Sequence, residues 1–369
     1  MIEPVAHFEI GYTRCLDPAG KTVAELPEFA RDPSKLVKLY QALTRTRAFD
    51  ARAIALQRTG RLGTFASSLG QEAVSVGTAD AMQPADVLVP SFREHGAQLM
   101  RGVTPSELFL YWGGDERGSA YAGPREDFPL CVPVGSHAPH AAGIALAFKL
   151  RHERRVAVCM FGDGATSKGD VAEALNMAGL WRLPVVFVVS NNQWAISVPR
   201  QRQTAAATLA QKAIAAGMTG EQVDGNDVVA VRFVVGTAIE RARGGAGPSL
   251  IEAVTYRLGD HTTADDASRY RDDTEVSRHW PEEPLLRLRN YLVVAGHWSR
   301  EQEEHLLQET AREMDAAAEQ YLATPPQECE TIFDYTFARL PADLAAQRES
   351  ALAAKHAAES SRPPGGAAQ

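Results

Sequence analysis

Two short apolar runs near the middle of the chain have the length of buried β-strands: residues 156–161 (VAVCMF) and residues 185–189 (VVFVV). Between them, apolar residues recur at the spacing of one helix face, at Val171, Leu175 and Ala178. Pro184 would end this helix just before the second run. Because a strand–helix–strand crossover is almost always right-handed, the pattern predicts two parallel strands that lie side by side.

The same alternation of apolar and polar positions continues on either side of this unit. It predicts further strands at residues 86–90 and 250–256. Helices are expected at residues 34–57, 71–81, 104–112, within 131–150, and at 204–216, 228–241, 284–295 and 299–322. Capping-box spacing marks three of the expected helix starts, at Thr104/Glu107, Ser167/Asp170 and Ser299/Gln302.

Helices that alternate with strands indicate an α/β fold, with a parallel sheet covered by helices on both faces. Residues 1–33 carry several prolines and little periodicity, so we expect an extended N-terminal arm. Residues 34–351 would form the main domain, including the C-terminal helices. Residues 352–369 are rich in Ala, Ser, Pro and Gly and are expected to form a disordered tail.

Polar residues follow both central apolar runs. Gly162-Asp163-Gly164 comes directly after the first run, and Asn191-Asn192 comes after the second. Open α/β sheets bind ligands beyond the carboxyl ends of their strands, so Asp163 and Asn192 should lie at one edge of the sheet. A carboxylate and an amide oxygen are suitable ligands for Mg²⁺, which usually completes its shell with water and phosphate oxygens. The residues therefore predict a magnesium–diphosphate site.

The longer string GDGATSKGD…NMAGLWRLPVVFVVSNNQWAISVP resembles the alpha subunit of heterotetrameric 2-oxo acid dehydrogenase E1 components, which use thiamine diphosphate. The resemblance extends over about residues 8–351 and implies a thiamine-diphosphate-binding α/β fold. An ordinary βαβ unit with a polar turn is the plainer alternative. A dinucleotide-binding Rossmann protein would need a third glycine where Ala165, Thr166 and Ser167 stand. A catalytically silent scaffold that holds an E2 protein is a further alternative.

The resemblance also implies roles for individual residues. Asp163, Asn192 and the backbone carbonyl of Trp194 would hold Mg²⁺. His261 would contact the cofactor diphosphate and act in catalysis. The remaining cofactor contacts would come from Phe92, Arg93, Val132, Val134, Gly164 and Ala165. An arginine suits this place because its guanidinium can grip phosphate oxygens with two parallel hydrogen bonds.

Other polar residues are given no firm role. His95, His137 and His140 are expected to be structural, and Glu72 is expected to cap or pair within its helix. Phe65 is either a wall of the cofactor entrance or ordinary packing. Residues 257–272 (RLGDHTTADDASRYRD) are polar and should form a mobile loop that becomes ordered when cofactor binds. Thr262 and Thr263 stand where mitochondrial relatives carry a regulatory serine, which puts phosphorylation by that route in doubt.

No second α/β domain is evident that could hold the aminopyrimidine half of the cofactor. The resemblance therefore implies a beta subunit that supplies this half, in an α₂β₂ assembly, and a lipoyl-bearing E2 acyltransferase that takes up the acyl group. The expected substrate is a small 2-oxo acid. Pyruvate is the first choice from the overall resemblance to bacterial E1 alpha chains, and the absence from residues 131–137 of the hydroxyl-rich pattern of branched-chain enzymes also favours it. Branched-chain 2-oxo acids, which the loop at 257–272 favours, and acetoin remain alternatives.

Composition excludes several other classes of protein. The net charge of -8 argues against a general nucleic-acid surface. No apolar run approaches the ~20 residues that a membrane span needs. The N-terminal sequence MIEPVAHFEI lacks the basic start and apolar core of a secretory signal. The four cysteines are scattered without metal-ligand spacing, which is typical of reduced thiols in a cytoplasmic protein.

Overall fold

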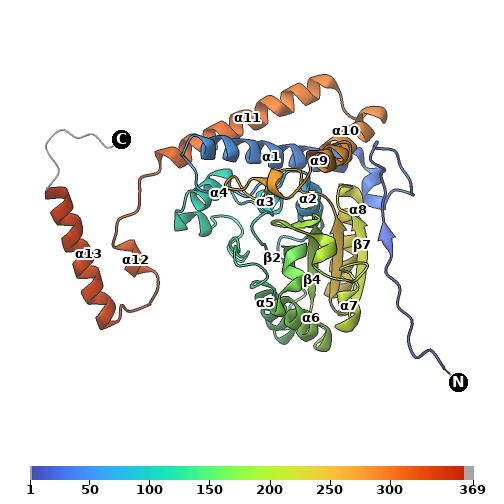
Figure 1. Ribbon diagram of the computed structural model, residues 1–369, viewed down its shortest axis with the longest axis horizontal. Helices are drawn as coiled ribbons and strands as arrows, with labels where there is room; N and C mark the ends of the chain where they lie inside the picture. The colour runs from blue at the N-terminus through green and yellow to red at the C-terminus, as the bar shows by residue number, and fades with distance from the viewer. Residues whose placement is uncertain (1, 361–369) are drawn as a thin grey trace. The chain divides into compact units, whose positions relative to one another are not determined.

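The computed structural model describes residues 2–360, and within them the central sheet has six strands, all parallel (Figure 1). In spatial order the strands are β1 (Tyr12–Thr13), β7 (Thr219–Asp224), β8 (Ser249–Val254), β4 (Val185–Asn191), β3 (Ala157–Gly162) and β2 (Val87–Val89). The predicted neighbours β3 and β4 lie side by side and parallel, with Gly162 opposite Ser190. A short antiparallel hairpin of β5 (Trp194–Ala195) and β6 (Val198–Pro199) follows β4.

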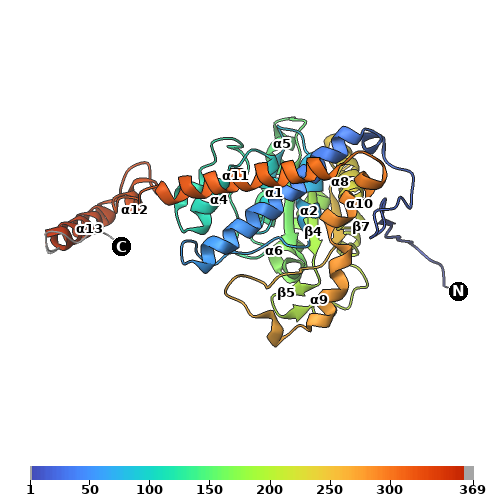
Figure 2. The ribbon, with the colours of Figure 1, turned by 90° about the horizontal axis from the view of Figure 1, so that it is seen from above.

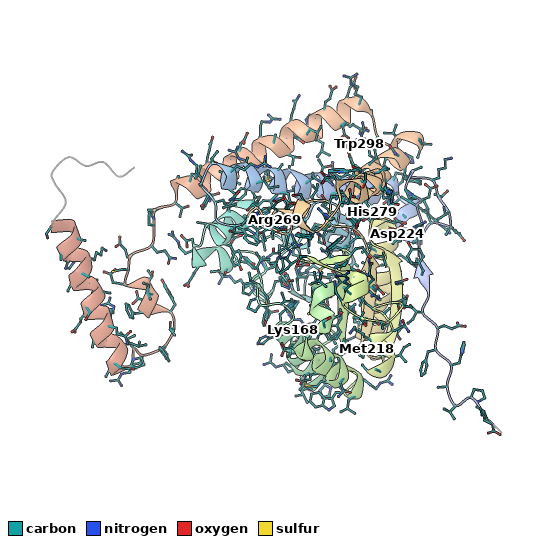
Figure 3. All side chains as sticks on the ribbon, viewed as in Figure 1. Lys168, Met218, Asp224, Arg269, His279 and Trp298 are labelled. Carbon is teal, nitrogen blue, oxygen red and sulfur yellow. The ribbon has the colours of Figure 1, made fainter. Side chains whose placement is uncertain are left out.

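Helices cover both faces of the sheet, as the sequence predicts. Helices α2 (Glu72–Ala81) and α8 (Val228–Arg243) bury one face, and their core extends to α1 (Pro33–Arg58) and α10 (Pro284–Val294). Helices α5 (Ala138–Leu150) and α6 (Gly169–Leu180) bury the other face. Successive strand residues point to opposite faces, so Val186 and Val188 join the first core while Phe187 and Val189 join the second. Side chains fill the space on both sides of the sheet (Figure 3).

A third apolar cluster lies beyond the sheet, around the C-terminal half of α1. It joins Phe49 of α1, Phe109 of α4 (Pro105–Trp112) and Met314 of α11 (Arg300–Ala323). Figures 1 and 2 show α11 running alongside α1. The other α-helices described before Tyr321 are α3 (His95–Met100), α7 (Lys212–Ala215) and α9 (Asp273–His279).

Two of the predicted helix starts are confirmed by their hydrogen bonds. Thr104 and Glu107 form a reciprocal capping box at the start of α4. Before α11, Ser299 N donates to Gln302 Oε1 (2.8 Å) and Gln302 N donates to Ser299 Oγ (3.2 Å). The third start is wrong, because α6 begins at Gly169 without a side-chain cap. Ser167 instead ends a 3₁₀ turn, Asp163–Ser167, that begins directly after β3.

Three further features differ from the sequence prediction. The N-terminal arm is not wholly irregular, because Tyr12–Thr13 pairs in parallel with β7 as an edge strand. The helix expected at residues 204–216 is reduced to Lys212–Ala215. Arg200 donates to the carbonyl oxygens of Thr204 (3.3 Å) and Ala206 (2.8 Å), which holds the preceding segment as a loop. Strand β7 was not expected, since its sequence TGEQVD has only one large apolar residue.

The chain divides into two compact units after Tyr321. The second unit begins at Leu322 and contains α12 (Thr331–Asp334) and α13 (Ala342–Ser360). The alanine-rich residues 352–360 continue α13, while the division into an arm, a main domain and a tail stays a prediction. Residues 361–369 lie outside the described residues. Across residues 2–360, no helix combines the length and the apolar character that crossing a membrane requires.

Candidate functional site

A cavity of about 620 Å³ opens at the carboxyl ends of β3 and β4. Seven separate segments of the chain line it: the loop before α2, the loop after β2, the end of α4, the loop before α5, the turn after β3, the hairpin after β4 and the loop after β8. All ten residues proposed from the sequence contribute to its wall: Phe92, Arg93, Val132, Val134, Asp163, Gly164, Ala165, Asn192, Trp194 and His261. Asp163 and Asn192, predicted from the strand ends, thus lie in one cavity with the residues that the family resemblance implied.

Asp163 is a buried carboxylate at the floor of the cavity. It follows Gly162, which pairs with Ser190, so Asp163 and Asn192 leave adjacent strands at nearly the same level. Its side chain accepts a hydrogen bond from Gln203 Nε2, and it forms no ion pair with any described residue. Burial raises the pKa of Asp163 above its usual value, because the charged form is costly to hold away from water. A cation in the cavity would offset this cost.

Asn192 is held by two hydrogen bonds that orient its amide. Its Nδ2 donates to Gln71 Oε1 (3.0 Å), and its Oδ1 accepts from Trp194 N (3.2 Å). Gln71 also lines the cavity, and its Nε2 is buried without a hydrogen-bond partner within residues 2–360. A buried donor of this kind is costly unless a ligand or water satisfies it.

The carbonyl oxygen of Trp194, proposed as a metal ligand, already accepts a hydrogen bond from Arg257 Nη1 (3.0 Å). A carbonyl oxygen has two lone pairs, so one remains for a second partner. Arg257 also donates to the carbonyl of Ile196 (2.9 Å). This buried arginine therefore fixes the β5–β6 hairpin against the end of β8.

Arg93 and His261 form the basic side of the cavity. Arg93 Nη1 donates to Ser67 O (2.7 Å), and its Nη2 lies 2.9 Å from His261 Nδ1. Burial and the charge of Arg257 lower the pKa of Arg93 to about 9. Burial, Arg93 and Arg257 lower the pKa of His261 to about 3. Neither Arg93 nor Arg257 forms an ion pair with a described acid, and positive groups gathered in a buried cavity in this way are suited to an anion.

His261 is therefore neutral near pH 7 in this structure, although a protonated imidazole also seemed suitable from the sequence. Because an arginine can only donate, Nδ1 must accept from Arg93, and the ring proton lies on Nε2. Phe92 contacts the same ring edge-on, with centroids 6.0 Å apart.

Apolar side chains surround the opening of the cavity. Val132 is 52% exposed and Val134 is 44% exposed, on the loop that precedes α5. Ile196, on the hairpin, is 54% exposed. Exposed apolar residues that cluster at an opening are typical of a surface that another molecule covers.

Several residues that the sequence left without a role are now placed. Phe65 is packing and not an entrance wall, since it is fully buried against Phe49, His95 and Trp112. His137 is buried, with Nε2 2.8 Å from Met160 O. Glu72 does not pair within its own helix but with Arg47 of α1.

Sequence reasoning missed four polar residues around the cavity. Gln71 and Gln203 bind the proposed metal ligands, and Arg257 holds the hairpin. Glu94 lines the cavity, and burial raises its pKa to about 7. None of the four belongs to a recognisable local sequence pattern. For Glu94, the only signal in the sequence was its position next to Arg93.

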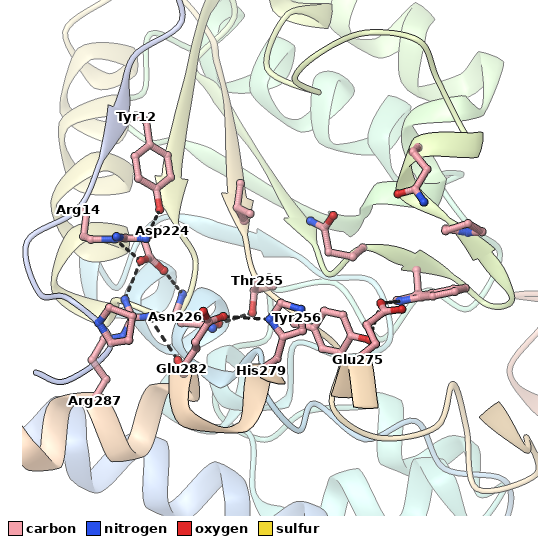
Figure 4. Close-up of a pocket in the computed structure, with 16 residues that line it drawn as sticks. Tyr12, Arg14, Asp224, Asn226, Thr255, Tyr256, Glu275, His279, Glu282 and Arg287 are labelled. Atoms are coloured by element: carbon pink, nitrogen blue, oxygen red, sulfur yellow. Dashed lines mark hydrogen bonds and ion pairs between the residues drawn. The ribbon is translucent and has the colours of Figure 1, made fainter. Parts of the chain in front are cut away.

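A smaller cavity of about 380 Å³ shares Trp194 with the first one (Figure 4). Asp224 lies between two arginines there, accepting from Arg14 Nε and from Arg287 Nη1, both at 2.7 Å. Glu275 accepts from Tyr256 Oη (2.8 Å) and from the Trp194 indole (3.2 Å). Both acids thus have hydrogen-bond donors from the protein, and none of the ten residues proposed from the sequence, apart from Trp194, lines this cavity.

Comparison with known proteins identifies the family to which this chain belongs. The model of the family described as "Dehydrogenase E1 component" matches residues 40–330. The chain belongs to the dehydrogenase E1 family. This E1 chain is 42% identical over 334 residues to a 3-methyl-2-oxobutanoate dehydrogenase subunit alpha of Mycobacterium tuberculosis, covering 90% of this chain and 91% of the relative.

Two further relatives are named after a different substrate, pyruvate. The E1 chain is 40% identical over 337 residues to a pyruvate dehydrogenase E1 component subunit alpha of Acholeplasma laidlawii, with 90% and 97% of the two chains covered. It is 36% identical over 350 residues to the protein of that name from Staphylococcus epidermidis, with 94% of each chain covered. The family match excludes the Rossmann alternative and the plain βαβ unit.

Proposed function

We propose that this E1 chain is the alpha subunit of a 2-oxo acid dehydrogenase E1 component and, with a beta subunit, decarboxylates pyruvate and passes the acyl group to a lipoyl-bearing E2 protein. One observation carries the proposal. A single cavity is lined by a buried acid, an oriented amide and a cluster of basic groups, all at positions named from the E1 motif. Such a cavity suits a metal-bound diphosphate.

The residues present fit Mg²⁺. No group of three or more His, Cys, Asp or Glu side chains within residues 2–360 could hold a metal ion. The proposed ion would instead rely on Asp163, the Asn192 amide oxygen and the free lone pair of the Trp194 carbonyl. Water and diphosphate oxygens would complete the shell. The buried, unpaired charge of Asp163 supports this assignment, because a cation is what that charge lacks.

The other side of the cavity fits the diphosphate. Arg93 can donate to phosphate oxygens, and the neutral His261 can donate from Nε2. The unsatisfied Gln71 Nε2 offers a further donor. When bound, thiamine diphosphate would supply the nucleophile and the electron sink for decarboxylation. The chain's own part is to bind and orient the diphosphate, with the His261 Nε2 proton donated to a phosphate oxygen.

A beta subunit would complete the site. The exposed side chains of Val132, Val134 and Ile196 at the opening support an apolar partner surface there. The resemblance assigns the aminopyrimidine half of the cofactor to that partner. An α₂β₂ assembly would then enclose the cofactor between the two kinds of subunit.

Pyruvate is proposed as the substrate, and 3-methyl-2-oxobutanoate is the second candidate because the M. tuberculosis relative carries that name. The test is to purify the chain together with its beta subunit and to measure ferricyanide reduction with each 2-oxo acid, in the presence of thiamine diphosphate and Mg²⁺. We expect kcat/KM to be at least ~10-fold higher for pyruvate, a difference worth about 1.4 kcal/mol. The reverse ratio would assign the branched-chain substrate. No turnover of either, with no cofactor binding, would contradict the proposal.

A further inference from the structure

Asp50 is a buried carboxylate of α1 that stands behind the cavity wall and not in it. It is 2% exposed. Its Oδ2 accepts hydrogen bonds from Ser67 Oγ (2.7 Å), Ser68 N (2.6 Å) and Ser68 Oγ (3.0 Å). One oxygen atom of α1 therefore fixes two consecutive residues of the loop that precedes α2. Burying a carboxylate is expensive unless hydrogen bonds compensate for lost water, and here these bonds all come from that loop.

The loop fixed by Asp50 in turn fixes Arg93. Ser67 presents its carbonyl oxygen to Arg93 Nη1 at 2.7 Å, and the other nitrogen of the guanidinium reaches His261. Arg93 forms no ion pair with a described residue, so its orientation depends on acceptors such as this carbonyl. Ala66, next to Ser67, belongs to the cavity wall, as does Thr64. A shift of Ser67 would therefore be transmitted directly to the basic side of the cavity.

The second oxygen of Asp50 faces another residue behind the cavity. His95 Nδ1 lies 3.7 Å from Asp50 Oδ1, and within the described part of the chain neither atom has a hydrogen-bond partner. His95 Nε2 is 3.1 Å from Trp112 Nε1, which can only donate. The proton of the neutral His95 ring therefore lies on Nδ1 and faces Asp50. Trp112 lines the cavity, so Asp50 stands behind two parts of its wall.

We propose that Asp50 is a positioning residue for the anion-binding side of the cavity: it fixes Ser67 so that the Ser67 carbonyl holds the Arg93 guanidinium in place. This inference rests on the proposed function, in which Arg93 binds the cofactor diphosphate. If its role were purely structural, Asp50 would only hold α1 and the loop together, and its substitution would not act on cofactor binding through Arg93. The two roles differ in what happens when Arg93 is absent.

The test is a double-mutant cycle in the co-purified α₂β₂ complex, with thiamine diphosphate affinity measured by calorimetry at saturating Mg²⁺. Asp50→Asn keeps the shape but replaces the carboxyl group that accepts the three hydrogen bonds. We expect it to raise the Kd roughly 5- to 20-fold, and Arg93→Ala to raise it further. In the Arg93→Ala background, Asp50→Asn should have no additional effect. Ser67→Ala, which removes one of the three bonds, should give a smaller increase of the same kind.

Asp227→Asn is the matched control, because Asp227 is also a fully buried acid with several backbone partners, but none of these partners lines the cavity or contacts Arg93. It should lower thermal stability and leave the Kd unchanged. The inference would be overturned if the double variant raised the Kd by the product of the two single-variant increases, those of Asp50→Asn and Arg93→Ala. It would also be overturned if the Kd were unchanged in both Asp50→Asn and Ser67→Ala. An unchanged Kd in Arg93→Ala would instead contradict the proposed function. If Asp50→Asn fails to fold, the cycle of Ser67→Ala with Arg93→Ala decides in the same way.

Discussion

Arg93 and His261 meet across 168 positions of sequence, with Arg93 Nη2 2.9 Å from His261 Nδ1. The contact sets the tautomer of the imidazole and keeps it neutral, because a second arginine, Arg257, also faces it at 3.4 Å. The same histidine that the sequence offered as a possible cation is thus a neutral donor between two cations. This arrangement determines how the site should respond to pH.

We expect His261→Ala to weaken thiamine diphosphate binding without changing how the binding depends on pH. Removing the Nε2 donor should raise the Kd about 10-fold, the usual cost of a hydrogen bond to a charged group. Because the pKa of His261 is lowered to about 3, the ring does not titrate between pH 6 and 8. Calorimetry at pH 6, 7 and 8 should therefore give parallel plots of log Kd against pH for the two proteins. Plots that converge toward pH 8 would show that the ring is protonated when it binds.

Asp163→Asn should abolish the dependence of cofactor binding on Mg²⁺, because the substitution keeps the shape but removes the charge that the cation would neutralise. In the complex without cofactor, by contrast, the same substitution should not lower thermal stability. Burial raises the folded-state pKa of Asp163, so its ionised form destabilises the fold above pH 4. The variant should therefore melt at the same or a higher temperature than the native complex at pH 8. A lower melting temperature without cofactor would contradict this account of the charge.

Gly164→Ala should disturb the hairpin that carries Trp194. A Cβ at Gly164 would lie 2.7 Å from the Cβ of Ala195, too close for either to stay in place. Cofactor affinity should fall at least ~10-fold, since overpacking a fixed contact typically costs 1–3 kcal/mol. Gly169→Ala is the control, because a Cβ there meets no atom within 4 Å. Equal affinities for the two variants would show that the hairpin moves freely.

The sequence could predict the parts of this protein that depend on local pattern. Asp163 and Asn192 follow uninterrupted apolar runs, so their meeting at one sheet edge follows from the βαβ rule alone. Strand β7 could not be found this way, because TGEQVD has only one large apolar residue and becomes a strand by pairing with β8. The loop that replaces most of the helix expected at residues 204–216 depends on a hydrogen bond from Arg200, and helix propensities do not take account of such a contact.

The supporting residues of the site are hidden for a related reason. Gln71 and Asp50 matter through partners more than a dozen positions away, Asn192 and Ser67. A single sequence shows which residues carry suitable atoms, but not which distant atoms they meet. The residues proposed from the strand ends and the family motif do line one cavity, whereas the residues that orient them were not predictable.

Glu94 should make the protein less stable as the pH rises through neutrality. Burial raises its pKa from 4.5 to about 7, and the nearby Arg93 only partly opposes this shift. The folded state thus holds the proton more tightly than the unfolded state, so stability is fully present below pH 4.5 and is lost as the pH rises through 7. Glu94→Gln, which cannot ionise, should be more stable than the native protein at pH 8 by up to about 3 kcal/mol.

The measurement is the difference in melting temperature between Glu94→Gln and the native complex, recorded without cofactor at pH 5 and at pH 8. We expect a clear gain at pH 8 and little difference at pH 5, where the native carboxyl is already mostly protonated. Glu304→Gln, at an exposed pair with Arg300 on α11, is the control and should show no such pH dependence. A gain of equal size at both pH values would mean that Glu94 affects packing and not charge. A loss at pH 8 would mean that its negative charge is balanced by Arg93, and that the two residues act as one neutral pair in the wall of the cavity.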